Sequence, residues 1–299
     1  MISIIIPTYN YICTKLVKDL ANQAKKLKDK LRDKFDYEII VAEDGSNDIK
    51  TITENRKIQD IPHCKYFERK NNVGRAFLRN WLIEQARFNY LLLIDSDALV
   101  FTPDFIEKYW NSRNQADFIC GGLRNPQSKC PTGCELRYRY EHQAEEKRTR
   151  TDLNLAPHLR LSTFNLFINK EILGTLRFDT RCKEYGYEDA LLGLELKERG
   201  NTVKHIDNPL IHNGIDTNES FLKKTETAMC TLSGLEGIMQ QNAGTSRAYT
   251  LLQKYHLLFP FRLFFACTQH LIRHNLVSHH PSLILFQLYK LGYYSKICK

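Results

Sequence analysis

Short apolar runs alternate with amphipathic segments along most of the chain. Five runs rich in β-branched, leucine or aromatic residues predict strands at 2–6, 37–42, 64–68, 90–94 and 117–122. Between them, apolar residues recur at helical spacing, which predicts helices at 12–35, 75–86 and 103–112. Strands that alternate with helices predict an α/β fold with a mostly parallel central sheet covered on both faces.

Polar clusters follow three of the predicted strands directly. They are Thr8-Tyr9-Asn10, Glu43-Asp44-Gly45-Ser46 and Asp95-Ser96-Asp97. In parallel sheets, ligands bind outside the carboxyl ends of the strands. An Asp-x-Asp triplet alone fits an acidic turn as well as a cation site, since about one is expected by chance in a chain of this length. Three such clusters together favour a ligand site.

The order and spacing of several motifs resemble the family 2 glycosyltransferases. The motifs are ISIIIPTYN at 2–10, EIIVAEDGSND at 38–48, NNVGRAFLRN at 71–80, LLLIDSDA at 91–98, STFNLFINKEIL at 162–173 and YGYEDALLGLEL at 185–196. A further stretch, NPLIHNG at 208–214, is similar to the histidine segment of the chondroitin-polymerase and galactosyltransferase-like branch. The resemblance implies a GT-A nucleotide-sugar domain over 1–215, followed by a helical region over 216–299.

The resemblance also implies a divalent cation, Mn²⁺ or Mg²⁺. The charge that develops on a leaving diphosphate needs a cation or a basic clamp. Asp97 would ligate the metal, Asp95 would lie nearer the ribose or reach the metal through water, and His212 would be a further ligand. A lone histidine is as often structural. Arg79 would bind phosphate oxygens through its planar fork, with Arg75 as a rival for that role.

Contacts to the rest of the donor are expected near the first two strand ends and the start of helix 75–86. The residues are Pro7, Thr8, Tyr9, Glu43, Asp44, Asn72 and Gly74. Backbone groups and the Tyr9 ring suit a uracil, and the acidic turn would accept from the ring N–H or the ribose hydroxyls. The family commonly has two aspartates where this chain has Glu43-Asp44, and Asp44-Gly45-Ser46 is also a competent turn.

Asp189 is the expected catalytic base. Inverting transfer needs a carboxylate that takes the proton of the acceptor hydroxyl. By resemblance Asp189 has this role, and Glu188 binds hydroxyls of the acceptor or donor. An acidic pair at the start of a helix is alternatively only a cap. The charged, irregular stretch 123–160 predicts an acceptor or lid loop.

The charge of the chain is uneven. The net charge is +9, yet no Asp or Glu follows Glu236, and that tail carries seven Lys or Arg and five of the ten His residues among dense leucine and aromatic residues. This composition is typical of a segment that binds a membrane surface, although a helical cap on the main domain is the alternative.

The remaining composition indicates a cytoplasmic setting. Nine cysteines without a framework predict reduced thiols, and Cys130 and Cys134 are expected to be free. The apolar opening ends at Pro7, too early for a signal peptide, and no apolar run is long enough to span a membrane.

Taken together, the residues and the resemblance predict an inverting, metal-dependent transferase. Its donor would be a UDP-sugar, and its acceptor a glycan or lipid-linked hydroxyl in surface polysaccharide or glycolipid synthesis. The chain would act at the inner face of the membrane. The alternative is a degenerate module that docks at membranes without catalysis. A nucleotidyltransferase lacks support, since no glycine-rich basic loop follows the first strand, and no nucleic-acid partner is expected.

Overall fold

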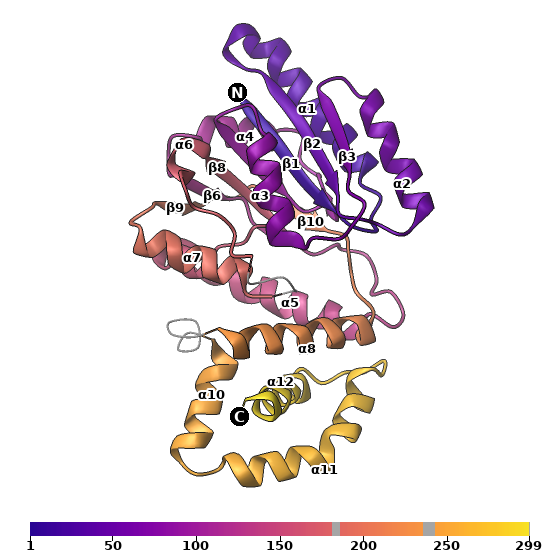
Figure 1. Cartoon of the computed structure of the whole chain (residues 1–299), viewed down its shortest axis with the longest axis vertical. Coiled ribbons are helices and arrows are strands. Elements are labelled where there is room, and N and C mark those ends of the chain that lie inside the picture. Colours follow the sequence, from indigo (N-terminus) through magenta and orange to yellow (C-terminus); the bar gives the residue numbers. More distant parts are fainter. Residues whose placement is uncertain (181–185, 236–242, 299) are drawn as a thin grey trace. The chain divides into compact units, whose positions relative to one another are not determined.

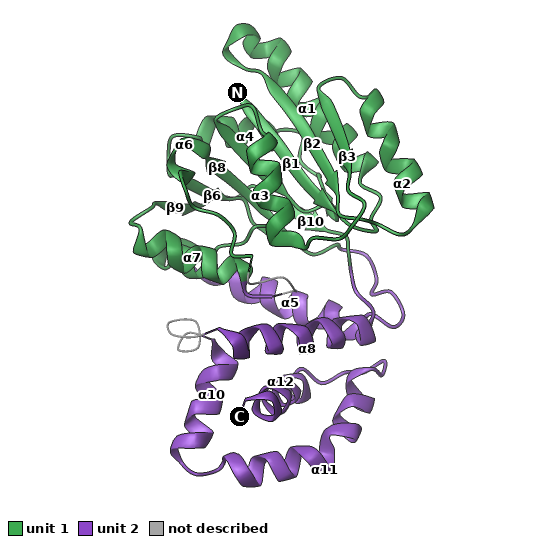
Figure 2. Ribbon diagram, in the orientation of Figure 1, with its two compact units in different colours: residues 1–126, 152–183, 188–214 green, residues 127–151, 184–187, 215–299 purple. Residues whose placement is uncertain are grey.

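A computed structural model of the chain describes residues 1–180, 186–235 and 243–298 (Figure 1). The chain forms two compact units (Figure 2). The first comprises residues 1–126, 152–183 and 188–214, and the second comprises 127–151, 184–187 and 215–299. The expected domains, 1–215 and 216–299, remain a prediction, since compactness alone does not establish an independently folding domain.

A seven-stranded sheet forms the centre of the first unit (Figure 1). Its strands are, in spatial order, β3 (Cys64–Glu68), β2 (Tyr37–Glu43), β1 (Ile2–Thr8), β4 (Tyr90–Ile94), β8 (Asn165–Asn169), β6 (Phe118–Cys120) and β9 (Val203–His205). Within this sheet, as far as the chain is described, only β8 runs antiparallel to its neighbours. The predicted mostly parallel sheet is therefore confirmed.

A smaller sheet brings together three distant segments of the first unit. Its strands are, in spatial order, β5 (Ala98–Leu99), β10 (Leu210–His212) and β7 (Leu123–Arg124). Strand β10 is antiparallel to β5 and parallel to β7. Because β5 follows shortly after β4, this sheet lies just beyond the carboxyl end of a central strand.

The central strands are buried on both sides, so the first unit has two hydrophobic cores. Alternate side chains of β1 point to opposite faces, so Ile4 and Ile6 join one core and Ile5 joins the other. Helices α1 (Thr14–Leu31) and α4 (Phe105–Ser112) cover the face of Ile4. Helices α3 (Arg75–Gln85) and α7 (Glu188–Glu198) cover the face of Ile5.

Shorter elements complete the first unit. They are α2 (Ile49–Arg56), α6 (Lys170–Leu173) and the 3₁₀ turns η1 (Arg32–Lys34), η2 (Lys57–Asp60), η3 (Leu153–Leu155) and η4 (Pro157–Arg160). The side chain of Asp48 begins α2 by accepting from the N–H groups of Lys50 and Thr51.

The second unit is helical, which confirms the predicted helical C-terminal region. Its described helices are α5 (Glu135–Thr149), α8 (Asn218–Gly234), α10 (Gly244–Lys254), α11 (Leu258–Leu276) and α12 (Leu283–Ile297). Helix α12 lies among the others and contacts α5, α8, α10 and α11 (Figure 1). None of the helices in the described ranges combines the length and apolar character needed to cross a membrane.

Helix α5 corrects the expectation of a loop over 123–160. Its sequence carries many charges and almost no apolar stripe, so hydrophobic periodicity gave no signal. The helix is stabilised instead by an ion pair between Arg137 and Glu141, one turn apart, and by Leu136, which is fully buried among the aromatic residues of the second unit.

All eight cysteines in the described part of the chain are free thiols, Cys130 and Cys134 among them. Burial raises the pKa of both thiols. Cys182 lies outside the described residues.

Candidate active site

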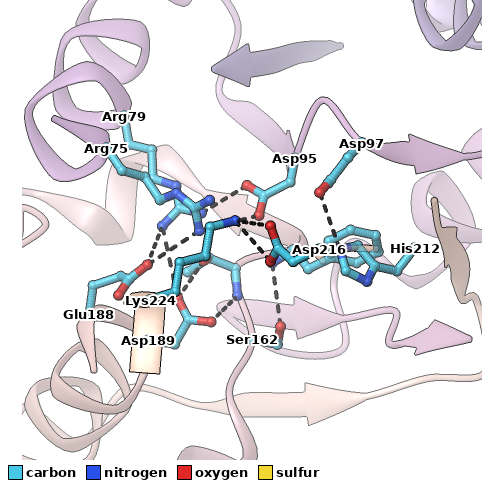
Figure 3. A network of polar contacts seen from close by, with 12 residues as sticks. Arg75, Arg79, Asp95, Asp97, Ser162, Glu188, Asp189, His212, Asp216 and Lys224 are labelled. Carbon is cyan, nitrogen blue, oxygen red and sulfur yellow. Dashed lines mark hydrogen bonds and ion pairs between the residues drawn. The ribbon is translucent and has the colours of Figure 1, made fainter. Parts of the chain in front are cut away.

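Asp97 and His212 are 115 positions apart in the sequence and meet where β5 pairs with β10. The N–H of Asn213 donates to the carbonyl of Asp97 at 2.8 Å. The Nε2 atom of His212 lies 3.1 Å from Oδ2 of Asp97 (Figure 3). Gly214 leaves room for this carboxylate, because a Cβ at that position would collide with it. We call these two side chains the Asp97–His212 pair.

The pair combines a carboxylate oxygen with an imidazole nitrogen, a donor set that suits Mn²⁺ and, through the oxygen, Mg²⁺. The side chain of Asp97 is 28% exposed, whereas that of His212 is 11% exposed and the residue is buried. Across residues 1–180, 186–235 and 243–298, no three His, Cys, Asp or Glu side chains are grouped to hold a metal ion. A cation at the pair would therefore need further ligands from a bound molecule, such as diphosphate oxygens.

A second group of charges, the arginine-bridged cluster, comprises Arg75, Arg79, Asp95, Glu188 and Asp189 (Figure 3). The side chain of Arg79 is 0% exposed and donates from Nη2 to Asp95 at 2.8 Å. Its Nη1 atom lies 3.8 Å from Glu188 and 3.9 Å from Asp189. Arg75 lies 3.5 Å from Glu188 and 3.7 Å from Asp95. The two arginines thus connect the end of β4 with the start of α7.

The surroundings of the cluster shift the pKa values of Asp95 and Asp189 in opposite directions. Burial raises the pKa of Asp95, but Arg79 and Arg75 outweigh this effect and hold that pKa below its ordinary value. Burial, followed by the negative charge of Glu188, raises the pKa of Asp189 despite the opposing effect of Arg79. Asp95 is therefore held as an anion, whereas Asp189 is the better proton acceptor.

Thr163 holds the carboxylate of Asp189. Its backbone N–H donates to Oδ2 at 3.1 Å, and its hydroxyl donates to Oδ1. These bonds fix Asp189 against the segment that precedes β8. Thr163 was not predicted as a site residue, although its position in the motif STFNLFINKEIL was an available signal.

Arg79 has a different environment from the one that its sequence position suggested. The guanidinium is enclosed, with the ring of Phe178 5.3 Å away. Among the described residues, Nε and Nη1 have no hydrogen-bond partner, although Nη1 is within ion-pair distance of two carboxylates. Arg75 is 47% exposed at its side chain and can approach a ligand from solvent. Phosphate binding by either arginine stays a prediction.

Glu43 and Asp44 both bind groups within the protein. Glu43 is buried and accepts from the Tyr66 hydroxyl at 2.9 Å. Asp44 accepts from the N–H groups of Val73 at 2.9 Å and Gly74 at 3.1 Å. The acidic turn thereby fixes the loop that leads into α3. Their contacts with a base or ribose stay a prediction.

Two glycines allow the loops after β2 and β3 to pack. Gly74 has a φ of 88°, which residues with a Cβ rarely adopt, and its N–H also donates to the side chain of Asn72 at 3.1 Å. Gly45 has a φ of 70°, and a Cβ there would lie 2.5 Å from the backbone of Asn71. This packing sets where α3 begins, and hence where its two arginines point.

The end of β1 adds aromatic groups to the same edge of the sheet. Pro7 and Thr8 are buried, whereas Tyr9 is half-exposed. The Thr8 hydroxyl donates to the carbonyl of Tyr11 at 3.1 Å. Tyr11, which the sequence analysis did not single out, accepts at its hydroxyl from the Asn213 amide at 3.2 Å. This bond places a phenol beside the β5–β10 pair.

The chain is similar in sequence to several known proteins. A family model described as glycosyl transferase family 2 matches residues 3–174. The minor teichoic acid biosynthesis protein GgaB of Bacillus subtilis is 25% identical over 206 residues, which are 66% of this chain and 21% of GgaB. The dolichyl-phosphate beta-glucosyltransferase of Dictyostelium discoideum is 30% identical over 128 residues, 40% of this chain and 39% of that protein. The chain thus spans between about a fifth and two fifths of these relatives.

A solved structure has the same fold. Glucosyl-3-phosphoglycerate synthase from Mycobacterium tuberculosis, in complex with Mn²⁺, UDP and phosphoglyceric acid, superposes with a TM-score of 0.51. The match covers 80% of each chain at 18% sequence identity. This likeness establishes the GT-A type of fold.

Proposed function

The chain belongs to glycosyl transferase family 2, and we propose that it transfers a sugar from a UDP-sugar to an acceptor hydroxyl with inversion. The observation that carries the proposal is that the Asp97–His212 pair and the arginine-bridged cluster lie near one another beyond the carboxyl end of β4, which Asp95 and Asp97 both follow (Figure 3). One group suits a cation and a diphosphate, and the other contains an oriented base.

The Asp97–His212 pair is the proposed metal site. Asp97 and His212 would hold Mn²⁺ or Mg²⁺, which would neutralise the developing charge of the leaving diphosphate. Arg75 is the more accessible arginine, so we assign it the direct phosphate contact. Arg79, enclosed among carboxylates, holds Asp95 in place, where its anionic form suits ribose hydroxyls.

Asp189 is the proposed catalytic base. Its raised pKa makes it a stronger base than an ordinary aspartate, and Thr163 fixes its direction. The proton of the acceptor hydroxyl passes to Asp189 as the oxygen attacks the anomeric carbon and the bond to the diphosphate breaks. Glu188, held by both arginines, would bind sugar hydroxyls.

The nucleoside is proposed to bind along the ends of β1 and β2. The half-exposed Tyr9 ring offers a stacking face, and backbone groups of Pro7 and Thr8 lie beside it. Glu43, Asp44, Asn72 and Gly74 form the loops around this position, so their main contribution would be to shape the nucleoside pocket.

The acceptor is proposed to be a growing glycan or a lipid-linked sugar. GgaB is named for teichoic acid biosynthesis and the Dictyostelium relative for dolichyl phosphate, and both names fit an acceptor at a membrane. We therefore propose that the protein contributes to a surface polysaccharide or a glycolipid from the cytoplasmic face. No nucleic-acid partner is proposed.

Release of UDP from a panel of UDP-sugars, with and without Mn²⁺, tests the proposal. Slow hydrolysis of one donor is expected, dependent on metal and abolished in Asp97→Ala. Asp189→Ala should still bind the donor and fail in transfer once an acceptor is supplied. Asp29→Asn, an exposed position on α1, is the control that should leave turnover unchanged.

The opposite result has a clear meaning. If the folded wild-type protein neither releases UDP nor binds nucleotide in a metal-dependent way, the transferase proposal is wrong. A catalytically degenerate module would then be the better description. Turnover of a GDP-sugar instead would keep the reaction and replace the donor.

A further inference from the structure

The outward side of α11 carries large apolar side chains that remain exposed. Phe259 is 79% exposed, Leu263 59%, Phe264 50% and Leu271 70%. We call these four residues the α11 outer face. Exposed apolar residues scattered singly are ordinary, but four on one helix mark an interaction surface.

Helical spacing places the α11 outer face away from the core of the second unit. Phe265, Ile272 and Leu276 are buried and pack in one cluster with Phe286 and Tyr289 of α12. At 3.6 residues per turn, Phe259, Leu263, Phe264 and Leu271 fall within an arc of about 140° on the side of the helix opposite these buried residues. The side chains of the α11 outer face are therefore not needed for packing on α12.

The turn before α11 extends the apolar surface. Tyr255 is 63% exposed and Leu257 51% exposed, and both come directly before the helix. Leu251, on α10, is also exposed. Aromatic rings and leucines at the end of one helix and along the next form a surface typical of the region between lipid headgroups and acyl chains.

The charged side chains of α10 and α11 are all basic, and Arg273 of α11 pairs with Glu226 of α8 at 3.2 Å. No acidic residue occurs after Glu236, and Arg247 and Lys254 on α10 are exposed. All five histidines of the tail are exposed as well, and two of them, His270 and His274, lie on α11 itself. An anionic surface is therefore electrostatically complementary to it.

We propose that the α11 outer face binds the surface of an anionic phospholipid bilayer. The apolar side chains enter the headgroup region while Arg247 and Lys254 meet the lipid phosphates. The inference extends the proposed function, since a lipid-linked acceptor would be met at that bilayer. A second copy of the chain fits less well, because a two-fold contact through this face would bring like charges together.

Vesicle flotation of the full chain tests the inference. Wild-type protein should float with phosphatidylcholine vesicles that contain phosphatidylglycerol, and float less with phosphatidylcholine alone or at high salt. The double variant Phe259→Ser, Leu271→Ser should bind at least about tenfold more weakly, because two large apolar contacts are removed. Lys254→Glu should weaken binding only to the anionic vesicles.

Two matched controls separate the face from general surface effects. Leu155→Ser alters a leucine of the first unit that is 82% exposed, and Lys18→Glu alters an exposed lysine on α1. Both should float as the wild type does. Circular dichroism of each variant checks that it is folded, which is expected because every substituted side chain is exposed.

Either of two outcomes would overturn the inference. One is that wild-type protein does not float with anionic vesicles, or that the double variant floats equally well. The other is a dimer without vesicles that Phe259→Ser, Leu271→Ser splits into monomers, which would make the face a subunit contact. UDP release from soluble donors is measured in parallel, so a failed flotation with intact turnover refutes the inference and leaves the transferase proposal standing.

Discussion

The Asp97–His212 pair and the arginine-bridged cluster differ in how many of their charges are already paired within the protein. The Asp97–His212 pair consists of two side chains at 3.1 Å where β5 pairs with β10, and Asp97 is the more exposed of the two. The arginine-bridged cluster contains three carboxylates joined by two arginines, one of them with a fully buried side chain. A ligand can therefore complete the first group, whereas the second is already organised before a ligand arrives.

The largest effect is expected from removing the charge of Arg79. Arg79→Met would leave Asp95 and the Glu188–Asp189 pair without their buried counter-charge, and breaking a buried ion pair costs about 3–5 kcal/mol. Urea denaturation measures the loss. Arg87→Met removes an exposed arginine and should change stability by less than about 1 kcal/mol. A similarly small change for Arg79→Met would contradict the description of Arg79 as the buried counter-charge of these carboxylates.

The next largest effect is expected on the affinity of the Asp97–His212 pair for a cation. In Gly214→Ala the new Cβ would displace the carboxylate of Asp97, so the affinity for Mn²⁺ in the presence of UDP should fall by about 10–100-fold. Calorimetric titration measures it. Gly244→Ala, where an added Cβ meets nothing within 4 Å, is the matched control. Unchanged Mn²⁺ affinity would show that Asp97 does not hold the cation.

The fold and the motifs were predictable because they depend on local patterns. Continuous apolar runs gave the central strands, and the polar clusters at their ends gave the edge on which the site lies. The pairing of Asp97 with His212 depends on β5 and β10, which are too short to leave a periodic signal, so only the resemblance joined them.

The environment of Arg79 was not predictable from periodicity. An arginine on an amphipathic helix is ordinarily at the surface, and its burial here depends on carboxylates from two distant segments. Thr163 and Gly214 were missed for a related reason. Thr163 acts through its bonds to Asp189, and Gly214 acts through the absence of a side chain. Neither property can be recognised from the composition of the sequence.

A smaller effect is expected from Thr163→Val, which removes one hydrogen bond to Asp189 and nearly preserves shape. That bond lowers the pKa of Asp189, so its loss should raise this pKa further. The base must be deprotonated, so as the solution is acidified the Thr163→Val variant should lose transfer activity at a higher pH than the wild type does. The pH profile of kcat measures it, with Thr53→Val on α2 as the control. An equal loss of kcat at every pH would indicate a purely structural role.

The smallest change in stability is expected for Arg75→Met. The size of this change decides whether Arg75 is available to a ligand. Arg75 makes longer contacts, 3.5 and 3.7 Å, and its side chain is 47% exposed, so Arg75→Met should cost less than about 1 kcal/mol. The KM of the Arg75→Met variant for the UDP-sugar should nevertheless rise, because the substitution removes a phosphate contact that is made both before and during transfer. If Arg75→Met instead destabilised the fold as much as Arg79→Met, both arginines would serve only to stabilise the fold by neutralising its carboxylates. Phosphate binding would then fall to the cation at the Asp97–His212 pair alone.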